Sequence, residues 1–146
     1  MRQDLVVSQS VDVNVDLARM WRVLTDPTII KDYLYGTETV TDWKVGSPIV
    51  FQGEYNGKQY VDKGVVLDNV LNKRIQYSYW SAFTGLEDKP ENYSTITYEL
   101  NFVSDSLITF TWIQKGFATE EAYNGTKGRM PAFVEQIRGI AEEISV

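Results

Sequence analysis

The 146-residue sequence contains neither cysteine nor histidine. Without cysteine, the chain forms no disulfide and has no thiolate to act as a nucleophile or a metal ligand. Without histidine, it lacks imidazole ligands, a Ser-His-Asp triad and the commonest general base near neutral pH. Catalysis would therefore depend on aspartate, glutamate, lysine, tyrosine or an external cofactor, and we predict neither a resident cofactor nor a metal.

Basic residues and long apolar runs are also scarce. The 14 lysines and arginines are outnumbered by 20 aspartates and glutamates, which gives a formal net charge of −6. No basic stripe is available for nucleic acid or for an anionic membrane, so neither is predicted as a partner. No apolar run reaches the roughly 18 residues of a membrane span, and no secretory signal pattern is present. We predict a cytoplasmic protein.

Aromatic side chains, in contrast, are plentiful. They make up 13% of the sequence and gather in segments with the alternation of β-strands. The length suits a single domain over residues 1–146 with one sizeable core.

The N-terminal part predicts a strand followed by two short helices. Leu5–Val13 alternates and is rich in valine, which is typical of a strand. Asn14 is predicted to cap a first helix that ends at Thr25. Asp26-Pro27 suits a new cap with proline in the first turn, so a second helix is expected through about Tyr33.

The middle of the chain predicts about six antiparallel strands. Its strongest signal is Asn56-Gly57, because both residues tolerate the positive φ of a two-residue hairpin turn. The alternation around Phe51 places Glu54 on the convex, solvated face. Residues 82–92 are predicted to form a longer loop. The predicted strands cover residues 37–43, 49–55, 58–68, 73–80, 93–103 and 107–115.

The C-terminal part predicts one long amphipathic helix. A short helix could start at Thr119, and Gly125 and Gly128 are expected to interrupt it. From Met130 to Ile144, apolar residues recur at helical spacing and form a stripe that needs a large apolar partner. The aromatic face of the sheet is the only candidate. The order of elements therefore predicts an α+β fold, with a curved antiparallel sheet wrapped around the C-terminal helix and a cavity between them.

Several segments, in this order, resemble the START-like (SRPBCC) superfamily, and within it the activator-of-Hsp90-ATPase-homologue (AHSA1-like) family. They are Trp21–Pro27, Asp42–Gly46 followed by Phe51, Gly64–Leu67, Tyr77–Trp80 and Gln114–Phe117. The resemblance implies a helix-grip (START/Bet v 1-like) fold with a hydrophobic cavity. It also implies a lipid, sterol, polyketide or other apolar ligand, or a role like that of relatives that stimulate the Hsp90 ATPase.

The predicted ligand site combines the aromatic wall of the sheet with the facing side of the last helix. A simpler interpretation is that these side chains only fill the core. Lys127 and Arg129 could meet an anionic ligand head at the cavity mouth, or could belong to a solvated helix start. The predicted cavity-lining residues are Trp43, Phe51, Tyr77, Tyr79, Tyr98, Phe110, Trp112, Met130, Phe133 and Ile137.

Three functions remain open from the sequence. The first is binding of an apolar small molecule in the cavity. The second is an interaction module that contacts a chaperone or another protein, with the chain itself a monomer or a homodimer. The third is an enzyme that uses a cavity tyrosine or a carboxylate such as Glu54 or Asp62. The strand alternation does not obviously turn a carboxylate inward, so no catalytic residue is assigned.

Overall fold

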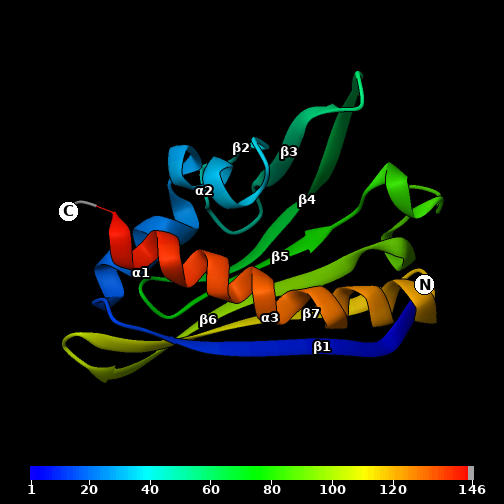
Figure 1. Ribbon diagram of the computed structural model, residues 1–146. Helices are drawn as coiled ribbons and strands as arrows, with labels where there is room; N and C mark the ends of the chain where they lie inside the picture. The colour runs from blue at the N-terminus through cyan, green and yellow to red at the C-terminus, as the bar shows by residue number, and fades with distance from the viewer. Residues whose placement is uncertain (145–146) are drawn as a thin grey trace.

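The computed structural model describes residues 1–144. Seven antiparallel strands form a curved sheet in the order β1-β7-β6-β5-β4-β3-β2, and the long helix α3 lies along its concave side (Figure 1). The predicted α+β helix-grip fold is confirmed. The elements are β1 (Arg2–Val13), α1 (Leu17–Thr25), α2 (Pro27–Tyr33), β2 (Glu38–Val40), β3 (Pro48–Tyr55), β4 (Lys58–Val70), β5 (Arg74–Tyr79), the 3₁₀ turns η1 (Ala82–Thr84) and η2 (Pro90–Asn92), β6 (Ser94–Ser104), β7 (Leu107–Phe117) and α3 (Glu120–Glu143).

Aspartates cap both short helices. Asp16 accepts a hydrogen bond from the Arg19 amide, and Asp26 accepts one from the Thr28 amide, as expected for the second helix. The prediction that Asn14 caps α1 is wrong. The Asn14 amide instead donates to the Glu142 carboxylate of α3 at 2.9 Å, so this residue ties the end of β1 to the last helix.

The Asn56-Gly57 hairpin sets the register of β3 against β4. Both residues have positive φ, +52° and +79°, as the turn prediction requires. Counting outward from the turn, Gly53 pairs with Tyr60 and Phe51 pairs with Asp62. Because directly opposed residues share a face of a sheet, Asp62 lies on the concave side with Phe51.

Helix α3 is continuous over Glu120–Glu143, although it contains Gly125, Gly128 and Pro131. The predicted interruption at the two glycines is therefore wrong. Thr119 caps the helix by accepting from the Ala122 amide, and contacts with the sheet support its first turns. Tertiary packing of this kind outweighs the roughly 1 kcal/mol that each internal glycine costs relative to alanine.

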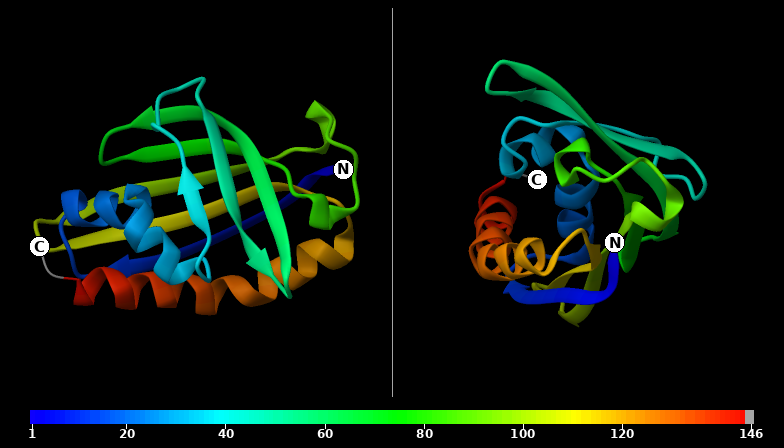
Figure 2. Two further views of the ribbon diagram at one scale, coloured as in Figure 1. Left: turned by 90° about the horizontal axis from the view of Figure 1, so that it is seen from above. Right: turned by 90° about the vertical axis from the view of Figure 1, so that its right-hand side faces the viewer.

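The core lies where α1, α2 and the C-terminal half of α3 meet the sheet. Figure 2 shows the sheet curling from β1, beside α3, round to the β3–β4 hairpin on the far side. The largest fully buried side chains include Met20, Leu24, Ile108 and Ile137. At the opposite end, the N-terminal half of α3 and the hairpin diverge, and this is where the pocket described below forms. Within residues 1–144, no helix has the length and apolar character needed to cross a membrane.

Gly64 and Gly128 should respond to alanine in opposite directions. A Cβ at Gly64 would lie 1.6 Å from the carbonyl oxygen of Ser78 on β5, so Gly64→Ala should reduce the free energy of unfolding by about 3 kcal/mol or more. Gly128 is exposed in the helix with nothing near its Cβ position. Gly128→Ala should therefore increase the free energy of unfolding by up to about 1 kcal/mol. Urea unfolding followed by circular dichroism measures both changes in stability. If Gly64→Ala were as stable as the wild-type protein, the close approach of β4 to β5 would be contradicted.

Candidate functional site

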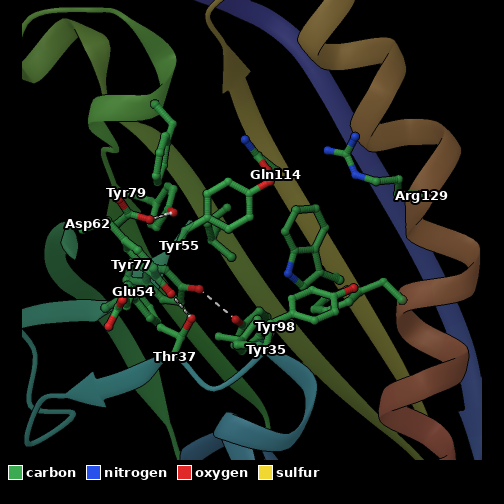
Figure 3. Close-up of a pocket in the computed structure, with 17 residues that line it drawn as sticks. Tyr35, Thr37, Glu54, Tyr55, Asp62, Tyr77, Tyr79, Tyr98, Gln114 and Arg129 are labelled. Atoms are coloured by element: carbon green, nitrogen blue, oxygen red, sulfur yellow. Dashed lines mark hydrogen bonds between the residues drawn. The ribbon is translucent and has the colours of Figure 1, made fainter. Parts of the chain in front are cut away.

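A pocket of about 720 Å³ lies between the concave face of β3–β7 and the part of α3 around Arg129 and Phe133 (Figure 3). Six tyrosines, three phenylalanines and one tryptophan line it, so its walls are mainly aromatic. The complete lining is Leu34, Tyr35, Thr37, Phe51, Glu54, Tyr55, Tyr60, Asp62, Tyr77, Tyr79, Phe83, Ile96, Tyr98, Trp112, Gln114, Arg129 and Phe133.

Most of the predicted aromatic residues meet in this pocket. Strand alternation explains the grouping, because these residues share the concave face of adjacent paired strands and Phe133 faces them from α3. The sequence-predicted residues that line the pocket are Phe51, Tyr77, Tyr79, Tyr98, Trp112 and Phe133.

Four predicted lining residues lie elsewhere. Trp43 adopts a left-handed backbone, φ +64°, and its indole N–H donates to the Thr25 carbonyl at 3.0 Å, so its ring packs beside α1. Phe110 is completely buried in the core at the other end of the sheet face. Met130 and Ile137 belong to the buried stripe of α3, which packs against the sheet, whereas the pocket meets an adjacent side of the helix.

The aromatic walls are held by contacts among the rings. Phe51 packs against Tyr77 and Tyr79 at centroid distances of 5.5 and 5.7 Å. The hydroxyls of Tyr77 and Tyr98 hydrogen-bond each other at 2.7 Å. Burial raises the pKa of both phenols, so these groups remain protonated. The walls therefore present ring surface to the pocket, while most of their polar groups are already partnered.

The main polar feature of the pocket is the pair Asp62–Tyr79. The Asp62 side chain lies on the floor of the pocket, and the residue is only 7% exposed. The Tyr79 hydroxyl donates to its Oδ2 atom at 2.5 Å. Burial and then the Asp62 carboxylate raise the pKa of Tyr79 far above its ordinary value, so Tyr79 acts as a hydrogen-bond donor and not as a base.

Asp62 was not singled out from the sequence as an inward-facing group, although a signal for it was present. The Asn56-Gly57 turn alone fixes the pairing of Phe51 with Asp62, and that pairing turns the carboxylate inward. Glu54 is exposed, as predicted, but it lines the rim of the pocket, so its predicted place on the convex face is not confirmed.

The two basic residues at the start of α3 have different positions. Arg129 projects toward the pocket from the side opposite Asp62 (Figure 3), and its Nη2 donates to Thr126 at 3.3 Å. Lys127 lies over the Tyr123 ring, 5.8 Å from its centroid, and does not line the pocket.

A second hollow of about 610 Å³ adjoins the pocket near the start of α3. The two share Tyr79, Phe83, Gln114 and Arg129. Its other lining residues include small and polar side chains, so it is less apolar than the pocket. Among the residues that the structure describes, no cluster of acidic side chains could hold a metal ion.

Removing the Tyr79 hydroxyl should destabilise the protein, because the buried Asp62 carboxylate would lose its donor. We expect Tyr79→Phe to reduce the free energy of unfolding by about 1–3 kcal/mol. Tyr55 is 62% exposed, so Tyr55→Phe is the matched control and should change stability by less than about 0.5 kcal/mol. Urea unfolding tests both variants, and equal effects would show that the Asp62–Tyr79 hydrogen bond adds no stability.

Comparison with known proteins places the chain in a family. The model of the Activator of Hsp90 ATPase homolog 1-like protein family matches residues 14–142. The solution structure of ChR145 from Cytophaga hutchinsonii is 33% identical, with a TM-score of 0.82 and 97% of each chain covered. No protein with a curated description matches significantly.

Two further solved structures share the fold at low identity. The Aha1 dimer from Colwellia psychrerythraea is 13% identical, with a TM-score of 0.71 over 95% of this chain and 97% of that one. PFC0360w, an HSP90 activator from Plasmodium falciparum, is 16% identical, with a TM-score of 0.70 over 93% of this chain and 95% of that one. The resemblance predicted from the sequence is confirmed: the chain belongs to the Activator of Hsp90 ATPase homolog 1-like family.

Proposed function

We propose that the protein binds an apolar, ring-containing small molecule in the pocket between the sheet and α3. The observation that carries this proposal is an aromatic-walled pocket of about 720 Å³. Binding sites for small molecules are commonly concave, mainly apolar, and in the range of about 300–1,000 Å³. A few polar groups, chiefly Asp62, Gln114 and Arg129, would orient the ligand.

The exposed aromatic rim supports the same proposal. Tyr35, Tyr55 and Phe83 are 88%, 62% and 68% exposed, and all three line the pocket. They come from three separate segments: the connection after α2, the end of β3 and the turn η1. A ligand that covered these rings would remove apolar surface from water, which favours binding by about 25 cal/mol per Å².

A neutral fluorescent probe tests the pocket. N-phenyl-1-naphthylamine should bind with enhanced emission, and Ile96→Trp, which adds a ring to the pocket floor, should weaken this binding by about tenfold or more. Thr95→Trp is the matched control, because Thr95 lies on the opposite face of the same strand, and it should change affinity by less than about twofold. Absence of probe binding, or equal effects of the two variants, would contradict the proposal. Native mass spectrometry of freshly purified protein would reveal a ligand that co-purifies.

A second candidate function is activation of an Hsp90-type ATPase through the convex face of the sheet. Family membership and the similarity to an HSP90 activator support it. So does a row of exposed apolar side chains on the outer face of β4, formed by Val61, Val65 and Leu67. Location in the cytoplasm and a monomeric or homodimeric state remain predictions from the sequence.

An ATPase assay separates the two candidates. If the second is correct, purified protein should stimulate Hsp90 ATP hydrolysis, and Val65→Glu should reduce this stimulation by about tenfold, because it places a charge in the middle of the apolar row. Val103→Glu, at an exposed position on β6, is the matched control and should leave stimulation unchanged. No stimulation by wild-type protein would exclude this function for the Hsp90 tested.

A further inference from the structure

We propose that the ligand of the pocket carries a protonated amine, which binds the Asp62 carboxylate. This inference rests on the proposed function, because it names the chemical class of the molecule that the aromatic pocket takes. It follows from three features of the pocket: a buried carboxylate, the lack of a protein cation beside it, and the ring surfaces around it.

The first feature is the incomplete partnering of Asp62. The residue is 7% exposed, and the Tyr79 hydroxyl donates a hydrogen bond to its side chain. A carboxylate has about four acceptor sites, so one phenol leaves most of them open. Burial of a carboxylate is costly unless a positive charge compensates it. The neutral Tyr79 hydroxyl offers no such charge.

The second feature is where the nearby cations point. Lys63 follows Asp62 on β4, but its side chain turns to the other face, where it pairs with Asp88 at 2.5 Å and lies over Trp80. Arg129 projects from α3, on the opposite side of the pocket (Figure 3). Across residues 1–144, no lysine or arginine forms an ion pair with Asp62. A compensating charge would therefore come from the ligand.

The third feature is the aromatic surface beside the carboxylate. Phe51 lies directly opposite Asp62 across the β3–β4 pair, and its ring contacts those of Tyr77 and Tyr79. Ring faces attract cations, and this attraction strengthens when the cation is desolvated. Asp62 and the rings together therefore suit an ammonium group attached to an apolar body. A metal ion is a poorer match, because no group of three acidic ligands exists in the described part of the chain.

An anionic ligand held by Arg129 is the competing arrangement. Arg129 is exposed, so its charge is already solvated and gains less from a ligand than the buried Asp62 does. The experiment below distinguishes the two arrangements.

Three indoles of similar size and different charge test the proposal. Tryptamine, tryptophol and indole-3-acetate are cationic, neutral and anionic at pH 7, and each is titrated against bound N-phenyl-1-naphthylamine. We expect tryptamine to displace the probe at concentrations about tenfold or more below those needed for tryptophol. Asp62→Asn, which keeps the shape and removes the charge, should abolish this preference. Asp105→Asn, the matched control, removes an exposed carboxylate in the turn between β6 and β7, outside the pocket, and should change the preference by less than about twofold.

The outcomes separate this inference from the proposed function. Equal displacement by all three indoles, or a preference for indole-3-acetate, would overturn the amine inference while leaving an apolar pocket in place. A tryptamine preference that survives in Asp62→Asn would overturn it as well. Loss of binding of the probe itself to wild-type protein would overturn both. Retained probe binding by Asp62→Asn shows that the variant is folded, so its loss of preference reports on the charge.

Discussion

The shape and charge of the pocket depend on the register of β3 against β4. The two left-handed residues Asn56 and Gly57 close the hairpin with no spare residue, and each pair along the two strands follows from that turn. A shift by one residue would exchange the two faces of a strand, which would place Asp62 outside and Lys63 inside. The pocket would then lose its carboxylate and gain a cation. A single tight turn therefore decides the charge of the site.

The two ends of the fold differ because their side chains fill space differently. Toward α1 and α2, flexible aliphatic side chains such as Met20, Leu24 and Ile137 pack to full burial. Near the hairpin, rigid rings meet edge to face and support one another, so they line a space instead of collapsing into it. Gly53 contributes to this arrangement, because Tyr60 lies where a Cβ of residue 53 would be.

Local signals in the sequence were sufficient for the fold and for much of the pocket. The aspartate cap before Pro27, the Asn56-Gly57 turn and the alternation of aromatic residues act over a few residues, so they are visible without coordinates. Trp43 and Phe110 could not be placed in this way. The direction of Trp43 depends on a left-handed backbone and on a carbonyl 18 residues away, while the position of Phe110 depends on how far along the sheet the core extends. Asp62 was within reach, because its inward direction follows from the turn alone.

A buried carboxylate can serve the fold or a ligand, and the surroundings of Asp62 favour the ligand. If its role were only to accept the hydrogen bond of the Tyr79 hydroxyl, a neutral acceptor such as an amide oxygen would suffice. A neutral side chain at this position would also avoid the free-energy cost of burying an unpaired charge. The fold therefore does not require the negative charge of Asp62. Its charge faces a space that the protein does not fill, and a cation that entered this space would gain both the carboxylate and the surrounding rings.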